Sequence, residues 1–325
     1  MPGAGVTRIS HCRAGAQDSD SGGGGLIGRI VILGSTASGK SDVAMAVAEH
    51  VDDTQILAVD AMQVYRGMDI GTAKPTASDQ QVVPHYGIDL VEPSASFTVA
   101  EFQRYAYGAL QQAQNAHARV LIVAGTGLYL TAVIDDLKLP GEWPTIRAGL
   151  ADREPHSMFE QLIELDPVAA ARIDPSNHRR LARALEVCLG SGLPFSSFGP
   201  GTGAYPAIDT PQFGLLWPRD KLGVRIEQRV HRMIERGLVA EVSSLLQRPG
   251  GLSRTARQAL GYKELIEAIE GRCSFAEAIA STILRTRQFA VRQERWFRRD
   301  PRIRWVQVFE DPVGEVVPVI TELFG

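Results

Sequence analysis

Cysteine and long apolar runs are scarce in this chain. Its 325 residues contain only Cys12, Cys188 and Cys273, an odd number without metal-binding spacing. This usage argues against a disulfide framework and a zinc site, and it favours a reducing cytoplasm. No apolar run approaches the roughly 18 residues of a membrane helix, and no signal-peptide core opens the chain. We therefore expect neither a membrane span nor export.

An excess of charge is also missing. Lys and Arg total 34 against 37 Asp and Glu, the net charge is −3, and hydrophobic residues make up 44%. This composition gives no overall attraction to a membrane or a nucleic acid, so any such surface must be local. At this length we expect one large domain and a smaller one.

Residues 1–28 are rich in Gly and Ser and have no periodic apolar face. Their burial would not offset the entropy of ordering, which predicts a flexible tail. A mitochondrial presequence is the alternative because Arg8 and Arg13 are basic, but Asp18 and Asp20 oppose an amphipathic targeting helix.

A phosphate-binding motif directly follows an apolar run at residues 29–33. The pattern G-x-x-x-x-G-K-[ST] occupies Gly34, Ser35, Thr36, Ala37, Ser38, Gly39, Lys40 and Ser41. The run predicts a buried strand and residues 41–50 have helical spacing, so the context is strand, loop and helix. Loop amides and Lys40 would face a phosphate, and Ser41 would offer a hydroxyl to Mg²⁺. Kinase, GTPase, helicase and transferase chemistry all stay open.

Polar residues follow two further predicted strands. Residues 55–59 end before Asp60, and residues 120–124 precede Thr126, which lies between two glycines. Ligands of open α/β sheets bind at such carboxyl ends. From position alone, Asp60 is either a helix N-cap or a catalytic group, and Thr126 either contacts a ligand or belongs to a tight turn. Residues 62–75 lack regular periodicity and predict a shaped binding loop.

Residues 139–206 differ in character, because prolines alternate there with short helical patterns at 158–165, 167–173 and 178–189. The last helix has an apolar face and a basic face with Arg179, Arg180 and Arg183. Such a face is solvated by default, although RNA phosphates would also suit it.

The remaining chain returns to the first domain. Residues 85–91 and 213–217 predict strands, residues 222–236 predict a helix, and two S/T-x-x-E capping boxes, at Thr98 and Ser274, open further helices. Eight arginines lie between Arg285 and Arg304, interleaved with aromatic residues. This combination suits RNA phosphate contacts and base stacking. A solvated helix whose aromatic side chains enter the core is the alternative that composition favours.

Together these patterns predict an α/β fold, a P-loop NTPase-like parallel sheet with flanking helices plus an inserted small all-helical domain. We expect the catalytic core at residues 29–138 and 207–325, with basic helices toward its C-terminal end. The inserted domain would span residues 139–206.

The ordered motifs resemble the bacterial tRNA dimethylallyltransferases, also called isopentenyl-tRNA transferases. The resemblance covers roughly residues 29–308. It rests on GSTASGKS at Gly34, VDAMQVYRGMDIGTAKP at Val59, AGTGLY at Ala124, DPVAAARI at Asp166, RRLARALEV at Arg179 and TRQFAVRQ-x-RWFR at Thr286. Ala61 stands where the family usually has Ser, and Ala124 where Gly is common.

The resemblance implies transfer of a dimethylallyl group from its diphosphate to the exocyclic N6 amine of the adenosine 3′ to the anticodon, with release of diphosphate. Asp60 then resembles the general base for that amine. Thr126 would lie beside the reacting groups, and Arg225 would join residues 34–41 and Mg²⁺ at Ser41 in holding the diphosphate. ATP is not consumed in this scheme.

The resemblance also implies contacts with the tRNA anticodon loop from which the adenine must be extruded. The partners would be tRNA and dimethylallyl diphosphate, no membrane is implied, and nothing demands more than a monomer. The implied tRNA contacts are Asp60, Ala61, Met62, Gln63, Thr126, Arg147, Arg179, Arg180, Arg183, Arg257, Gly261, Tyr262, Lys263, Thr286, Arg287 and Arg292.

Two other functions compete with this one. A small-molecule or nucleotide kinase uses the same phosphate cradle but leaves the arginine-rich stretch unexplained. An RNA-binding module that only senses nucleotide explains that stretch and leaves Asp60 and Thr126 without a task.

Overall fold

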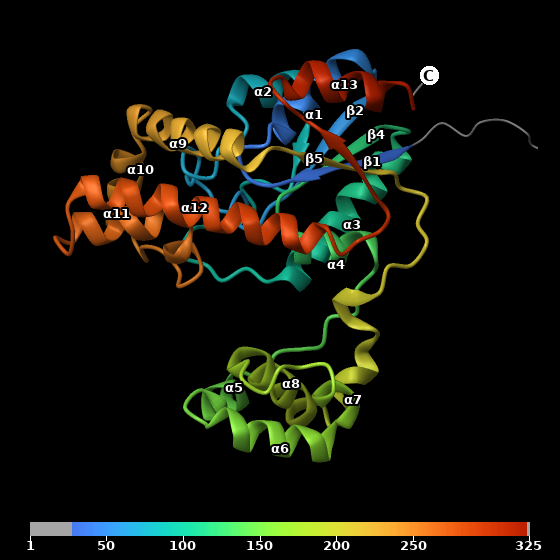
Figure 1. Ribbon diagram of the computed structural model, residues 1–325, viewed down its shortest axis with the longest axis vertical. Coiled ribbons are helices and arrows are strands. Elements are labelled where there is room, and N and C mark those ends of the chain that lie inside the picture. The colour runs from blue at the N-terminus through green and yellow to red at the C-terminus, as the bar shows by residue number, and fades with distance from the viewer. Residues whose placement is uncertain (1–27, 324–325) are drawn as a thin grey trace, which may run out of the picture.

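The computed structural model describes residues 28–323, so the tail expected over residues 1–28 lies, apart from Gly28, outside the described residues. Six parallel strands form one central sheet in the order β3-β2-β4-β1-β5-β6 (Figure 1). The strands are β1 Arg29–Gly34, β2 Thr54–Val59, β3 His85–Tyr86, β4 Arg119–Ala124, β5 Gln212–Leu216 and β6 Ile303–Gln307. The predicted parallel α/β sheet is confirmed.

Helices cover both faces of the sheet because its central strands are apolar on both sides. In β1, Ile30 and Ile32 face one hydrophobic core, whereas Val31 and Leu33 face the other. The first core is completed mainly by α1, α9 and α13, and the second by α3, α4, α10, α11 and α12. The core helices are α1 Lys40–His50, α2 Ala77–Val82, α3 Val99–Asn115, α4 Gly127–Ile134, α9 Arg219–Glu235, α10 Leu238–Gln247, α11 Tyr262–Ile269, α12 Phe275–Phe297 and α13 Pro312–Thr321.

Both predicted capping boxes form. Thr98 Oγ1 accepts the Glu101 backbone N–H, while the Glu101 carboxylate accepts the Thr98 N–H at 2.7 Å. Ser274 and Glu277 make the same exchange at the start of α12. These reciprocal bonds satisfy amides that would otherwise lack a partner, which explains why the sequence located these helix starts.

A second body of helices lies apart from the sheet and is joined to it by two segments, the second of which contains the short 3-10 helices Phe195–Phe198 and Gly201–Gly203 (Figure 1). It contains α5 Pro144–Leu150, α6 Pro155–Leu165, α7 Pro167–Ala170 and α8 His178–Ser191. These helices share a hydrophobic core of their own that includes Leu150, Met158, Leu162 and Leu185. All lie within residues 139–206, and α5 is an addition to the helices expected there.

Two expected elements differ in the structure. Of residues 85–91, only His85 and Tyr86 pair as a strand, while Val91 makes an isolated bridge to Tyr65. The arginine-rich stretch is not one helix, because α12 ends at Phe297 and the chain re-enters the sheet as β6. Pro301 explains this break, since the residue before a proline disfavours helix. No described helix is long and apolar enough to cross a membrane.

Candidate active site

The predicted catalytic segments meet at one edge of the sheet. The phosphate-binding loop follows β1, Asp60 follows β2 and Thr126 follows β4, and these strands are neighbours in the order β2-β4-β1. Because parallel strands end at the same edge, segments far apart in the sequence converge there.

Carbonyl groups of the loop of residues 34–41 accept hydrogen bonds from Lys40 within the loop and from two residues outside it. Lys40 Nζ donates to the Ser35 carbonyl at 2.8 Å, and Arg225 Nε donates to that of Ala37 at 3.0 Å. Trp217 Nε1 donates to the Ser38 carbonyl at 2.9 Å, and the Arg225 guanidinium stacks 4.5 Å from the Trp217 ring centre. These bonds fix the loop before any ligand is present.

Gln293 of α12 is a site residue that sequence reasoning missed. Its buried side chain accepts the Thr36 backbone N–H at 2.9 Å and donates to the Gly125 carbonyl at 2.7 Å. The Ser35 hydroxyl donates to the Ala290 carbonyl of the same helix. Helix α12 therefore connects the phosphate loop to the end of β4. The Thr36 amide, predicted as a phosphate donor, is already bonded here.

Asp60 uses its two carboxylate oxygens differently. Oδ1 accepts the backbone N–H groups of Met62 at 2.7 Å and Gln63 at 3.3 Å, so Asp60 caps a turn, although the helix expected after it does not form. Oδ2 has no hydrogen-bond partner within residues 28–323. A methyl group added at Gly125 would lie 3.6 Å from Oδ2 and 3.9 Å from Lys40 Cε. Oδ2 and the Lys40 side chain therefore both lie close to Gly125, and Asp60 interacts electrostatically with Lys40, so the capping and catalytic interpretations are compatible.

Thr126 lies at the start of α4, and neither of the glycines that flank it has a positive φ, so the turn does not need glycine dihedrals. A side chain at Gly127 would collide with the Trp296 ring, 2.1 Å away. The Thr126 Oγ1 accepts the Ala61 N–H at 3.3 Å, which joins the end of β4 to the turn after Asp60. The Thr126 hydroxyl therefore lies next to the turn that carries Asp60, and its contact with a ligand stays a prediction.

Not all of the cationic side chains at the site are paired with a carboxylate. Burial and the neighbouring Arg229 lower the pKa of Lys40 to about 7, against the opposing effect of Asp60 and Asp42. Burial likewise lowers the pKa of Arg229. Arg229 is partly buried, and its guanidinium has no hydrogen bond or ion pair to any described residue. A desolvated, unpaired cation of this kind favours an anionic ligand.

Arg229 is the second functional residue that sequence reasoning left without a role. It lies four residues after Arg225 on α9, so the two side chains share one face of the helix. That four-residue spacing is the sequence pattern that could have pointed to Arg229. It predicts a role only when the structure shows which face of α9 borders the phosphate loop.

A metal ion would have few protein ligands here. Ser41 is exposed on the first turn of α1, and residues 28–323 hold no cluster of acidic, His and Cys side chains suited to a metal. A single hydroxyl fits Mg²⁺ only when ligand phosphates and water complete the shell, which is the usual mode for this ion.

Residues expected to contact tRNA on the inserted helices are partly engaged inside the protein. Arg147 and Arg183 both pair with the fully buried Glu186, at 2.8 Å and 3.1 Å. Removal of these charges would leave Glu186 unpaired, so both arginines have a structural task. Arg179 and Arg180 are exposed, and their guanidinium groups contact no carboxylate among the described residues.

The predicted tRNA contacts of the core differ in exposure. Arg287 pairs with Glu227 at 2.7 Å and Arg257 with Glu270 at 2.9 Å, whereas Arg292 is exposed beside the Phe289 ring. Thr286 donates to the Thr282 carbonyl within α12. Tyr262 is fully buried, so its side chain is closed to a ligand in this structure, and Gly261 is buried beside the partly exposed Lys263.

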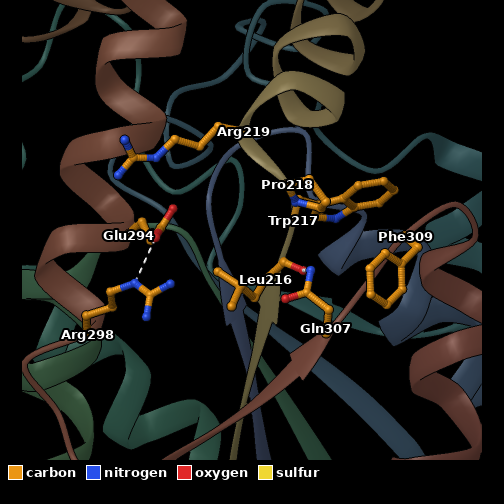
Figure 2. A pocket seen from close by; sticks show the side chains of 8 residues that line it. All are labelled: Leu216, Trp217, Pro218, Arg219, Glu294, Arg298, Gln307 and Phe309. Atoms are coloured by element: carbon orange, nitrogen blue, oxygen red, sulfur yellow. Dashed lines mark hydrogen bonds and ion pairs between the residues drawn. The ribbon is translucent and has the colours of Figure 1, made fainter.

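A hollow lies beside this site, at the carboxyl ends of β5 and β6 and next to α12 (Figure 2). Its volume is about 450 Å³. Arg219, Glu294, Arg298 and Phe309 line it together with Trp217, which holds the phosphate loop. None of the predicted site residues lines this hollow.

Comparisons with known proteins match most of the chain. The family model for IPP transferase matches residues 63–300. The tRNA dimethylallyltransferase of Kineococcus radiotolerans is 44% identical over 85% of this chain and 90% of its own length. That of Thermobifida fusca is 42% identical over 85% and 89%.

Solved structures show the same likeness. The tRNA isopentenylpyrophosphate transferase from Bacillus halodurans is 33% identical, has a TM-score of 0.67, and covers 92% of this chain and 97% of its own. A eukaryotic dimethylallyltransferase acting on tRNA has a TM-score of 0.76 at 22% identity, covering 91% of this chain and 77% of its own, which indicates the shared fold. Because the family model and these relatives extend over most of its length, this chain belongs to the IPP transferase family.

Proposed function

We propose that this chain transfers a dimethylallyl group from dimethylallyl diphosphate to the N6 amine of the adenosine 3′ to the anticodon of tRNA. The amine lone pair forms a bond to C1 of the dimethylallyl group while the bond from C1 to the diphosphate oxygen breaks. The amine proton passes to a base, and diphosphate leaves. The observation that carries this assignment is the free Oδ2 of Asp60, which lies close to Gly125 together with the Lys40 side chain.

The leaving diphosphate has cationic groups within reach. Lys40 and Arg225 bond to the phosphate loop, and Arg229 has no partner of its own among the described residues. Preorganised charges of this kind stabilise negative charge that develops in the transition state. Mg²⁺, held by Ser41 and phosphate oxygens, would supply further positive charge. Titration with a chelator tests this role of Mg²⁺, because the transfer rate should fall as the ion is removed.

Two observations support tRNA as the partner. The relatives are named tRNA dimethylallyltransferases, and two parts of this molecule carry arginines without a carboxylate partner among the described residues. Arg179 and Arg180 are exposed on α8 of the inserted helices, and Arg292 is exposed on α12 of the core. An anticodon loop between these surfaces would contact both through its phosphates. We also propose a monomer acting in the cytoplasm.

The experiment measures label transfer by the purified chain. Labelled dimethylallyl diphosphate and labelled ATP are supplied in separate reactions, each with and without tRNA. We expect label in tRNA only from dimethylallyl diphosphate. Phosphoryl transfer from ATP would instead indicate a kinase, and tRNA binding without transfer would indicate an RNA-binding module.

A further inference from the structure

Glu241 of α10 receives hydrogen bonds from a loop that lies far away in the sequence. Its Oε2 accepts the backbone N–H groups of Asp69 at 3.0 Å and Ile70 at 2.8 Å. Its Oε1 accepts the Gly71 N–H at 3.3 Å and the Tyr262 hydroxyl at 2.6 Å. Three successive amides therefore converge on one carboxylate, an arrangement that binds anions strongly.

Tyr262 completes this contact from α11. Its ring fits against Gly71, where an added Cβ would lie only 2.4 Å from Tyr262 Cε2. Burial and the Glu241 charge raise the pKa of the Tyr262 hydroxyl, so it stays a donor. Glycine is required at this position because a larger residue would displace the ring or the loop.

A buried lysine holds the same loop at a second point. Lys74 Nζ donates to the Tyr65 carbonyl at 2.8 Å and to the carboxylates of Asp69 and Asp89 at 2.6 Å each. All three ammonium protons are used, and the Lys74 side chain is only 2% exposed. The loop between residues 65 and 74 thus has a fixed shape.

The held loop is bonded directly to the turn that carries Asp60. Gln63 Nε2 donates to the carbonyls of Thr72 at 3.1 Å and Ala73 at 3.3 Å, immediately after the amides that Glu241 binds. The Gln63 backbone N–H donates to Asp60 Oδ1 at 3.3 Å. Glu241 therefore connects to Asp60 through hydrogen bonds joined by the backbone between Gly71 and Thr72 and by Gln63.

We propose that Glu241 and Tyr262 are positioning residues that hold the loop of residues 62–75 and, through Gln63, aim the free oxygen of Asp60. This inference rests on the proposed function, because it assigns the two residues to the base of that reaction. Neither residue touches substrate. Their loss misdirects Asp60 and leaves the diphosphate cradle intact, since no hydrogen bond among the described residues joins Glu241 to residues 34–41.

The test compares Glu241→Gln with wild type in steady-state transfer from dimethylallyl diphosphate to tRNA. Glutamine keeps one acceptor oxygen but turns an NH₂ group toward amide donors, which releases part of the loop. We expect kcat to fall by up to about 100-fold, as for other small misplacements of reacting groups. The KM for dimethylallyl diphosphate should not change.

Glu315→Gln is the matched control for a loss of stability alone. The Glu315 carboxylate also accepts three successive backbone N–H groups, from Phe309, Glu310 and Asp311, each at 2.9 Å. No hydrogen bond within residues 28–323 joins that loop to Asp60 or Gln63. We expect a lower unfolding temperature in both variants, with kcat at the wild-type level only in Glu315→Gln.

Tyr262→Phe provides a second, milder variant, because it removes one donor and keeps the ring against Gly71. It should lower kcat less than Glu241→Gln in the same direction. Wild-type kcat in both Glu241→Gln and Tyr262→Phe would overturn the inference, as would an equal fall of kcat in Glu315→Gln. A wild-type chain without any transfer would instead contradict the proposed function.

Discussion

At the scale of single residues, the site is defined by charges that the fold leaves unpaired. Asp60 Oδ2 and the Arg229 guanidinium have no hydrogen-bond partner among the described residues, although both lie at the crowded edge of the sheet. Unpaired buried charge lowers the stability of the free protein. Its presence here is consistent with a site arranged for a charged ligand rather than for stability.

Arg229→Met tests whether Arg229 lowers the stability of the free protein while it strengthens diphosphate binding. The substitution removes a desolvated cation and keeps an apolar stem, so the unfolding temperature should rise. The KM for dimethylallyl diphosphate should rise about 10- to 100-fold, the equivalent of one charge-assisted hydrogen bond. Calorimetry and steady-state kinetics measure the two effects.

Arg232→Met is the control for that experiment, because Arg232 is exposed on the same helix. It should change neither KM nor the unfolding temperature appreciably. A normal KM in Arg229→Met would remove this residue from the diphosphate site.

The motif and its apolar strand predicted the loop of residues 34–41. Asp60 and Thr126 also follow apolar strands, but their position left two interpretations open and only the family resemblance gave them a role in the site. Sequence reasoning gave no role to Gln293, Glu241 or Arg229. Gln293 and Glu241 act through contacts with elements far away in the chain, and their neighbours in the sequence carry no motif for such contacts. Arg229 had only its spacing from Arg225 as a signal, and that spacing does not show what the helix face borders. Tertiary partners, unlike strand ends and helix caps, have no local signature.

At the scale of elements, α12 combines the two interpretations of the arginine-rich stretch. Phe297 is buried and Trp296 packs against Gly127, so the aromatic side chains do enter the core. Arg285 and Arg298 pair with Glu264 and Glu294. Other arginines of the stretch contact no carboxylate of residues 28–323. They are Arg292, Arg295, Arg299 and Arg304.

Salt dependence of tRNA binding distinguishes these two kinds of arginine. Arg292→Gln should reduce the slope of log affinity against log salt by about 0.7 if Arg292 neutralises one phosphate of a single-stranded loop. Arg287→Gln should have a smaller effect, because Arg287 already pairs with Glu227. Slopes equal to wild type for both variants would show that α12 does not face the tRNA.

Element boundaries were predictable where local chemistry marks them. The capping boxes at Thr98 and Ser274 located α3 and α12, and apolar runs located β1, β2, β4 and β5. Strand β6 was missed, because it carries Arg304 and Trp305, part of the arginine-rich and aromatic pattern that suggested RNA contact. Pairing with β5 decides its conformation, and that partner is more than eighty residues away in sequence.

At the scale of the whole molecule, one arginine ties the inserted helices to the sheet. Arg302 is only 15% exposed and binds Asp135, at the start of one connecting segment, at 2.6 Å and Asp300 at 2.6 Å. It also donates to the Pro206 carbonyl at 2.8 Å, within the other connecting segment. Both segments that lead to the helices α5–α8 are thus fixed at one point.

Arg302→Met should therefore destabilise the protein strongly. Removal of one partner leaves Asp135 and Asp300 buried without their cation, at a cost of about 3–5 kcal/mol. Arg66→Met is the control, because the Arg66–Glu92 pair is half exposed and contributes about 0–1 kcal/mol. Urea unfolding measures both, and equal effects would show that Arg302 does not act as such a clamp.

The most direct measurement of the whole scheme is the single-turnover rate of Asp60→Asn with saturating tRNA and labelled dimethylallyl diphosphate. Asparagine keeps an oxygen for the Met62 and Gln63 amides, so the turn and the affinity for tRNA should persist. It cannot take the amine proton, and we expect the transfer rate to fall by about 10² to 10⁴. Transfer at the wild-type rate would show that Asp60 only caps the turn, and would contradict the mechanism.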